Sequence, residues 1–254
     1  MSVLQVRDLR RSFGGLLATA DVSFDVAEHS LTALIGPNGA GKTTLFNLIT
    51  NLFAPDAGSV TFEGTSLIGL SPSAIARLGV IRTFQTARVF PGMTVLENAM
   101  AGHHRLLRHG LVSQLAWWPR QRAEERRLAD RAMALLDLVG LADQADQPAT
   151  QLPMGAQKLL EVIRALLAQP KLLLLDEPAA GLNDTETAEL AALLRAIQAC
   201  GVTVMVVEHN MSLVMTIADQ VIVLEAGRLI ASGSPAQVQS NPRVIAAYLG
   251  EEVA

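Results

Sequence analysis

The sequence predicts an α/β fold: a mostly parallel central sheet, a peripheral antiparallel β-subdomain and an inserted helical subdomain. First, short runs of β-branched residues alternate with helical patterns, as parallel strands joined by crossover helices require. Second, Leu172 to Leu175 and Val204 to Val207 are apolar throughout, as strands buried on both faces are. Third, strand signals vanish between about residues 93 and 168, where helical spacing takes over.

Strands in the first quarter of the chain have a different pattern. Val3 to Val6, Val22 to Val26 and Val60 to Phe62 alternate apolar with polar residues, which is typical of half-exposed antiparallel strands. They form the predicted peripheral subdomain. Further strands are expected at Leu31 to Ile35 and Val221 to Leu224.

The inserted helical subdomain is predicted to span about residues 93–168 of a single domain covering residues 1–254. One helix is marked by an apolar face of Leu128, Ala132, Leu135, Leu136 and Val139. Repeats, low-complexity stretches and flexible linkers are not evident in the sequence, so a second independent domain is not expected.

Composition excludes several classes of protein. Half of the 254 residues are apolar and 17% are charged, which excludes general disorder. The net charge of −4 disfavours nucleic acid as a main partner. A signal peptide and an apolar run of the roughly 20 residues that a membrane span needs are both lacking, so export and spanning are not expected. The single Cys200 indicates a reducing compartment and is expected to be a small buried apolar side chain.

A phosphate-binding loop lies directly after the apolar run Leu31 to Ile35. It has the pattern of Gly, four residues, then Gly-Lys-Thr, and a helical segment follows. Inward-pointing backbone N–H groups and the positive end of that helix favour phosphate oxygens. Lys42 is then placed to reach the β- and γ-phosphates of a nucleotide, and Thr43 to bind Mg²⁺. The predicted phosphate-binding residues are Gly36, Pro37, Asn38, Gly39, Ala40, Gly41, Lys42, Thr43 and Thr44.

Two further apolar strands end in polar residues. Asp176 and Glu177 follow Leu172 to Leu175, at the carboxyl end of a strand where open α/β sheets bind ligands. Asp176 is predicted to hold Mg²⁺ through water, and Glu177 to orient and deprotonate the attacking water. His209 closes the strand ending at Val207 and could reach the γ-phosphate, although a lone histidine after a strand is more often structural. Gln85, taken alone, is likewise more often a glutamine of a surface turn.

The order of these parts resembles the nucleotide-binding subunit of ATP-binding-cassette (ABC) transporters over nearly the whole chain, and so implies a P-loop NTPase (RecA-like) fold. The resemblance implies that Phe13 stacks on adenine, that Gln85 belongs to the Q-loop and contributes to the metal site, and that Lys42, Gln85, Glu177 and His209 take part in catalysis. ATP and Mg²⁺ are the implied cofactors. Asn183 lies in the position of the D-loop, where aspartate is more usual.

The family signature Leu-Ser-Gly-Gly-Gln aligns with Leu152-Pro-Met-Gly-Ala-Gln157, and only Leu152 and Gly155 agree with it. In the family this segment caps the γ-phosphate of ATP bound to the other subunit of a pair. Because the serine hydroxyl and the signature glutamine are missing here, capping is left to backbone N–H groups and the positive end of the helix expected over Ala156 to Ala168.

The departures indicate a subfamily. The Leu-Pro-x-Gly signature, the Ala-Gly-Leu-Asn183 segment, the Arg82-Thr-Phe-Gln motif and the stretch Asn241 to Gly250 resemble ATPase subunits of branched-chain (hydrophobic) amino acid importers. The resemblance implies permease partners, a second ATPase subunit that is a relative or a second copy, an indirectly associated solute-binding protein and no nucleic acid. The implied location is the cytoplasmic face of the inner membrane.

Three alternatives stay open from sequence. The first is the ATPase of a lipopolysaccharide exporter. The second is a regulatory domain that binds ATP with little hydrolysis, as the altered signature would allow. The third is a soluble P-loop kinase or a DNA-repair ATPase; the kinase leaves Leu152 to Gln157 and His209 without roles, and the repair enzyme needs coiled-coil arms that 254 residues cannot contain.

Overall fold

A computed structural model describes residues 1–83, 89–106 and 118–249 of the chain, and the side chains of all these except 104–106, 118–121 and 249. It divides into two compact units. The first comprises residues 1–82, 171–180 and 190–254, and the second residues 83–170 and 181–189.

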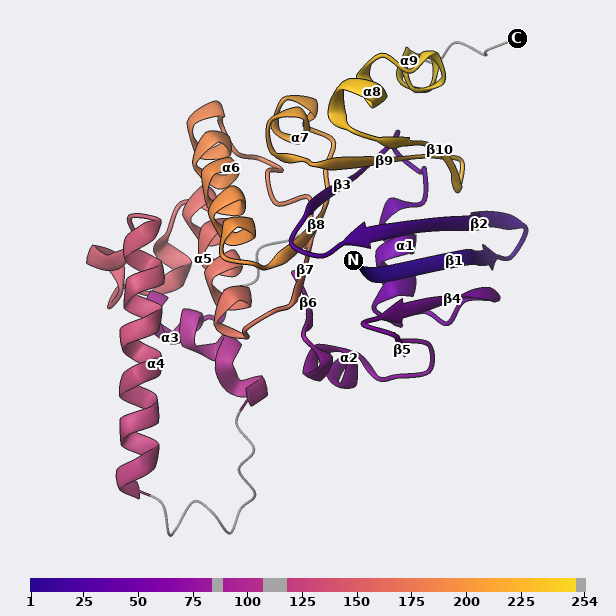
Figure 1. Ribbon diagram of the computed structural model, residues 1–254. Helices are drawn as coiled ribbons and strands as arrows, with labels where there is room; N and C mark the ends of the chain where they lie inside the picture. Colours follow the sequence, from indigo (N-terminus) through magenta and orange to yellow (C-terminus); the bar gives the residue numbers. More distant parts are fainter. Residues whose placement is uncertain (84–88, 107–117, 250–254) are drawn as a thin grey trace. The chain divides into compact units, whose positions relative to one another are not determined.

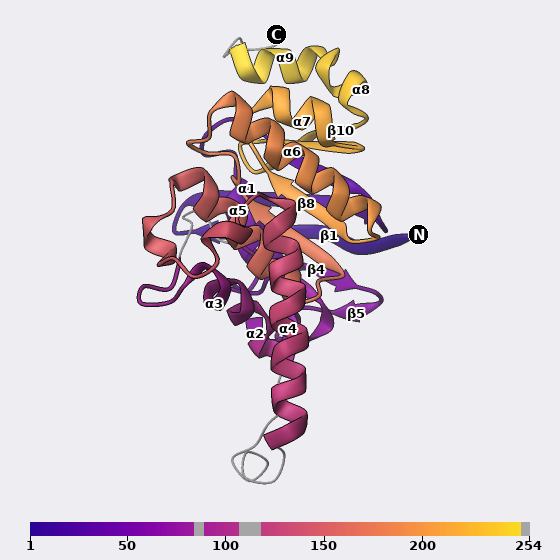
Figure 2. The ribbon, with the colours of Figure 1, turned by 90° about the vertical axis from the view of Figure 1, so that its left-hand side faces the viewer.

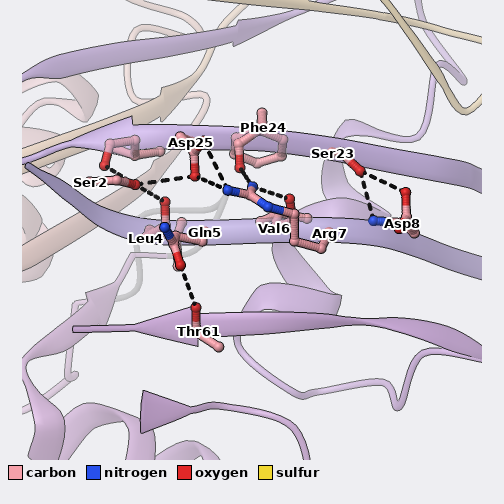
Figure 3. A network of polar contacts seen from close by, with 11 residues as sticks. Ser2, Leu4, Gln5, Val6, Arg7, Asp8, Ser23, Phe24, Asp25 and Thr61 are labelled. Carbon is pink, nitrogen blue, oxygen red and sulfur yellow. Dashed lines mark hydrogen bonds and ion pairs between the residues drawn. The ribbon is translucent and has the colours of Figure 1, made fainter. Parts of the chain in front are cut away.

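An antiparallel sheet forms one part of the first unit. Its strand order is β2-β1-β4-β5, with β1 Ser2–Phe13, β2 Leu16–Ala27, β4 Ala57–Phe62 and β5 Thr65–Ser66. Buried and exposed residues alternate from Ala20 to Ala27 of β2, as the sequence pattern predicts, whereas in β1 the alternation is interrupted at Val3 and Asp8. On the exposed face, Arg7 of β1 contacts both carboxylate oxygens of Asp25 on β2 (Figure 3).

A six-stranded sheet forms the other part, in the order β10-β9-β3-β8-β7-β6 (Figure 1). Its strands β3 Leu31–Ile35, β8 Thr203–Val207, β7 Leu172–Asp176 and β6 Val80–Arg82 are parallel, as is β9 Gln220–Glu225 to β3. Every residue of β3, β7 and β8 is buried. At one edge, β10 Arg228–Gly233 runs antiparallel to β9.

The main core of the first unit is built from both sheets and the helix α1 Lys42–Ile49. Leu4, Val6 and Val22 of the antiparallel sheet, Leu45, Phe46 and Ile49 of α1, and Leu34, Leu174, Val207 and Leu224 of the parallel sheet all belong to it. The unit also contains α2 Pro72–Leu78, most of α6 Asp184–Ala199, α7 Met211–Ile217, α8 Pro235–Gln239 and α9 Pro242–Leu249. Figures 1 and 2 both place α8 and α9 beside β10.

The second unit is helical in its described residues. It contains α3 Val95–Met100, α4 Trp118–Leu138, α5 Met154–Leu167 and the 3-10 helices η1 Ala101–Leu106, η2 Ala142–Gln144 and η3 Ala149–Gln151. Ala132 and Leu136 of the predicted apolar face of α4 are buried. A Cβ atom at Gly102 would lie 1.8 Å from the Arg164 carbonyl oxygen, so η1 and α5 are in close backbone contact.

Three strands were not predicted from sequence: β5, β6 and β10. β5 and β6 have only two and three residues, and β10 is half-exposed and carries polar residues. The expected burial of Cys200 is wrong, because this residue lies exposed after the end of α6. In the described part of the chain, every helix is too short or too polar to cross a membrane.

Candidate functional site

The loop between β3 and α1 is shaped by glycines that admit no side chain. Gly36 has φ 151°, and a Cβ there would lie 2.1 Å from the carbonyl oxygen of Leu224 on β9. Gly41 precedes α1 with φ 99°, and its Cβ would lie 2.4 Å from the carbonyl oxygen of Ala18 on β2. Both sheets therefore press against the loop backbone, and glycine is required at these two positions.

A cavity of about 540 Å³ lies over this loop, within the first unit. It brings Phe13, Asn38, Gly39, Ala40, Gly41, Lys42, Thr43, Thr44 and Glu177 together. The remaining lining residues, Leu16, Leu17, Ala18 and Ala226, were not predicted. Gly36 and Pro37, the first two residues of the loop, do not line the cavity, and their carbonyl oxygens accept hydrogen bonds from Lys42 Nζ.

The Lys42 ammonium is nearly buried. Its Nζ donates to the carbonyl oxygens of Gly36 and Pro37, at 2.7 and 3.0 Å. Burial lowers the pKa of Lys42 from 10.5, and the carboxylates of Glu177 and Asp176 oppose this shift. Lys42 therefore lines the cavity with its Nζ held by two carbonyl oxygens, which phosphate oxygens could replace.

Asp176, at the end of β7, forms a buried ion pair. Its Oδ2 accepts from Arg82 Nη2 at 2.8 Å, and the two side chains are 3% and 9% exposed. The Arg82 guanidinium also donates to Asn47 Oδ1 and Thr50 Oγ1 of the loop helix and its cap, at 2.7 and 3.1 Å. Arg82, the last residue of β6, thus connects α1 to Asp176 through its hydrogen bonds.

The same carboxylate has an oxygen that fits a metal. Asp176 Oδ1 is buried and has no hydrogen-bond partner among the residues that the structure describes. The hydroxyl-bearing Thr43 lines the cavity. Oxygen donors of this kind, one carboxylate with a hydroxyl and substrate phosphates, are what Mg²⁺ prefers in nucleotide sites. The residues present therefore fit Mg²⁺.

Glu177 adopts a left-handed backbone conformation, with φ 49°. Its N–H donates to the Val207 carbonyl oxygen at 2.9 Å, and its own carbonyl accepts from Ala180 N–H at 3.1 Å, which closes a sharp turn after β7. His209 lies exposed after β8 and is not among the residues that line the cavity. Gln85 lies outside the described residues.

The predicted signature and D-loop residues belong to the second unit. Leu152 is buried, and Gly155 lies in the first turn of α5, whose N-cap Pro153 makes no side-chain capping bond. A Cβ at Gly155 would lie 2.2 Å from a carboxylate oxygen of Glu186. Glu186 and Asn183 cap each other, each side chain accepting from the other's backbone N–H at 2.9 and 3.0 Å.

Several contacts around the site are not visible in sequence patterns. The Arg11 guanidinium lies 4.9 Å from the ring centre of Phe13, and Phe53 packs edge-on against that ring at 5.5 Å. Burial raises the pKa of Tyr248, on α9, and a hydrogen bond between the Tyr248 hydroxyl and the Gly36 backbone partly opposes this rise. Phe53 and Tyr248 reach the site through contacts between positions distant along the chain, which no sequence pattern specifies.

Comparisons with known proteins agree on one family. The family model described as ABC transporter matches residues 19–180, and one described as branched-chain amino acid ATP-binding cassette transporter matches residues 228–254. The chain is 44% identical over 250 residues to a high-affinity branched-chain amino acid transport ATP-binding protein, LivG of Salmonella typhimurium, covering 98% of each chain. It is 43% identical to the similarly described BraF of Pseudomonas aeruginosa, again covering 98% of each.

Solved structures agree with the fold. A nucleotide-free ATP-binding cassette from an ABC transporter is 32% identical, with a TM-score of 0.85 and coverage of 99% of this chain and 100% of the other. The ADP conformation of an ATP-binding cassette matches with the same values. The predicted α/β fold with a P-loop nucleotide-binding core is therefore confirmed.

Proposed function

We propose, since this chain belongs to the ATP-binding family of ABC transporters, that it hydrolyses ATP with Mg²⁺ to power import of branched-chain or other hydrophobic amino acids. The observation that carries the proposal is the cavity within the first unit. It joins the glycine-shaped loop, Lys42, Thr43 and Glu177. Asp176, whose charge acts on Lys42, has a buried oxygen without a hydrogen-bond partner among the described residues.

Binding of the nucleotide follows from the cavity lining. The loop N–H groups and Lys42 neutralise the phosphates, and Lys42 exchanges its two carbonyl partners for phosphate oxygens. Phe13, whose ring is braced by Arg11 and Phe53, offers a surface on which adenine stacks. The apolar Leu16, Leu17 and Ala226 extend that wall.

Hydrolysis uses the two carboxylates differently. Asp176 and Thr43, with Gln85, would hold Mg²⁺, which when bound supplies positive charge to the β- and γ-phosphate oxygens. Glu177 orients a water and takes its proton as the water attacks the γ-phosphorus, giving ADP and inorganic phosphate. His209, in the turn after β8, contacts the γ-phosphate of the bound nucleotide.

A second ATPase subunit completes the site. In this proposal Leu152, Gly155 and Asn183 act across a pair of subunits, where the first turn of α5 presents its N–H groups to the γ-phosphate held by the partner. Pro153 caps that helix without a side-chain bond, so those N–H groups are not used by a capping side chain. The partner is a related ATPase chain or a second copy of this one.

Energy from ATP is passed to integral membrane permease subunits at the cytoplasmic face of the inner membrane, while a solute-binding protein recognises the amino acid. The names of the relatives support this, as does the match of residues 228–254. Amino acid specificity then resides in other chains.

Affinity purification tests the partners. Tagged Glu177→Gln protein, which should retain ATP, is recovered with Mg-ATP from solubilised membranes, and its companions are identified by mass spectrometry. Two permeases, an ATPase subunit and an amino-acid-binding protein support the importer. Lipopolysaccharide-export components, or no membrane protein, overturn it. A Lys42→Met variant is the control, since it should lose the nucleotide-dependent part of the recovery.

A further inference from the structure

Glu208 is a fully buried carboxylate that none of the proposed steps uses. It follows the last residue of β8, its side chain is 0% exposed, and its N–H donates to the Leu34 carbonyl oxygen at 3.2 Å. Within the described parts of the chain, no lysine, arginine or histidine forms an ion pair with it. A buried acidic group without a cationic partner is costly unless hydrogen bonds stabilise it.

Those hydrogen bonds come from two different turns. Glu208 Oε1 accepts from the Ala179 N–H at 2.7 Å, in the turn that follows Glu177. Glu208 Oε2 accepts from the N–H groups of His209 and Asn210, at 3.1 and 3.4 Å, in the turn after β8. One side chain therefore connects the turn that carries Glu177 to the turn that carries His209.

The Glu177 turn needs such a restraint. A left-handed conformation is strained for a residue with a side chain, and it persists only where the surroundings impose it. The bond from Glu177 N–H to the Val207 carbonyl oxygen holds one side of the turn. The bond from Ala179 N–H to Glu208 holds the other.

We infer that Glu208 is a positioning residue for hydrolysis: it fixes the Glu177 and His209 turns to each other, and so sets the rate of the chemical step without contributing to nucleotide binding. This inference rests on the ATP hydrolysis proposed above. Glu208 itself does not line the nucleotide cavity.

Glu208→Gln is the matched change, because it preserves shape but replaces one acceptor oxygen by an NH₂ donor. Either the Ala179 N–H or the His209 and Asn210 N–H groups then lose their acceptor. The control is Asp219→Asn, since Asp219 also accepts a backbone N–H of this sheet, that of Leu31 at 2.8 Å, but at the amino ends of the strands. Both variants should lower the melting temperature.

The experiment compares kcat, KM for ATP and the affinity for a non-hydrolysable ATP analogue in the assembled transporter. We expect Glu208→Gln to lower kcat at least about tenfold while KM and analogue affinity change less than about threefold, a split that a transition-state effect produces. Asp219→Asn should retain kcat. Unchanged kcat in Glu208→Gln, or equal losses of kcat in both variants, would overturn the inference.

If Glu208→Gln does not fold, Glu208→Asp replaces it as the test variant, because it retains both acceptor oxygens on a shorter side chain. Its kcat should lie below that of wild type, with unchanged KM. A wild-type kcat in Glu208→Asp would then contradict the positioning role. Absence of ATP turnover in the wild-type transporter would instead refute the proposed function, so the two failures are distinguishable.

Discussion

The amino and carboxyl ends of the parallel sheet use the same kinds of contact in different surroundings. At the amino ends, Arg195 pairs with Asp219 at 3.1 Å, and the side chains are 42% and 41% exposed. At the carboxyl ends, Arg82 pairs with Asp176 at 2.8 Å, and both are almost fully buried. A carboxylate also accepts a backbone N–H at each end: Asp219 accepts from Leu31 at the amino ends, and Glu208 accepts from Ala179, in the turn after β7, at the carboxyl ends.

Burial changes what these contacts do. An exposed pair gains little, because water and salt screen it, whereas a buried group cannot lose its partner without a large penalty. Burial therefore fixes Asp176 and Glu208 at the carboxyl ends, where a substitution that removes a partner is costly. In this sheet, charge is buried at the end that carries the proposed hydrolytic site.

The two ends should differ most in stability when the arginine of each ion pair is removed. Arg82→Met leaves Asp176 buried without its cation, and we expect a loss of about 3–5 kcal/mol in the free energy of unfolding. Arg195→Met should cost no more than about 1 kcal/mol. Urea unfolding of both variants measures the difference. Equal losses would show that burial does not separate the two ends.

The glycines of the two ends offer a second comparison. A Cβ at Gly36 would lie 2.1 Å from a backbone oxygen, whereas one at Gly201, at the amino ends, would meet only His29 at 3.7 Å. Both glycines have positive φ. We expect Gly36→Ala to lose about 1–3 kcal/mol more than Gly201→Ala, since only the first is overpacked. Thermal unfolding tests this, and similar losses would contradict the close approach of β9.

The smallest predicted effect concerns the proton of Lys42. Because burial lowers its pKa in the nucleotide-free protein, Lys42 loses its proton at a lower pH than an ordinary lysine. ATP phosphates favour the charged form, so binding raises this pKa and takes up a fraction of a proton in alkaline solution. Affinity should therefore fall as pH rises through the lowered pKa.

Calorimetric titration with ATP, in alkaline buffers of different ionisation enthalpy, measures that uptake. The Lys42→Met variant is the control and should show none from this position. Net proton release by the wild type on binding would contradict the assigned role of Lys42.

Much of the fold could be predicted because strongly apolar or strictly alternating runs leave few alternatives. The fully buried strands at Leu31 and Leu172 and the alternating strand at Val22 show this. Strands of two or three residues, such as Val80–Arg82, carry too few positions to show a period. The burial of Cys200 was predicted wrongly because a small apolar side chain is accommodated as easily at an exposed helix end as in a core.

The site could be predicted only in its local part. The loop from Gly36 to Thr43 is a contiguous motif, and Asp176 with Glu177 ends an apolar strand. The contacts that hold these residues join distant positions: Arg82 reaches Asp176 across 94 residues, and Glu208 reaches Ala179 across 29. No spacing rule specifies such pairs. The roles of Gln85, His209 and the signature segment stay predictions.

Turnover by Glu177→Gln, measured beside wild type in the assembled transporter with Mg-ATP, tests the central claim most directly. Loss of the general base should lower kcat by about 100-fold or more while ATP affinity stays near that of wild type. Lys42→Met should instead lose ATP affinity, which separates binding from chemistry. Wild-type turnover by Glu177→Gln would contradict the assignment of Glu177 as the base and, with it, the proposed hydrolytic site.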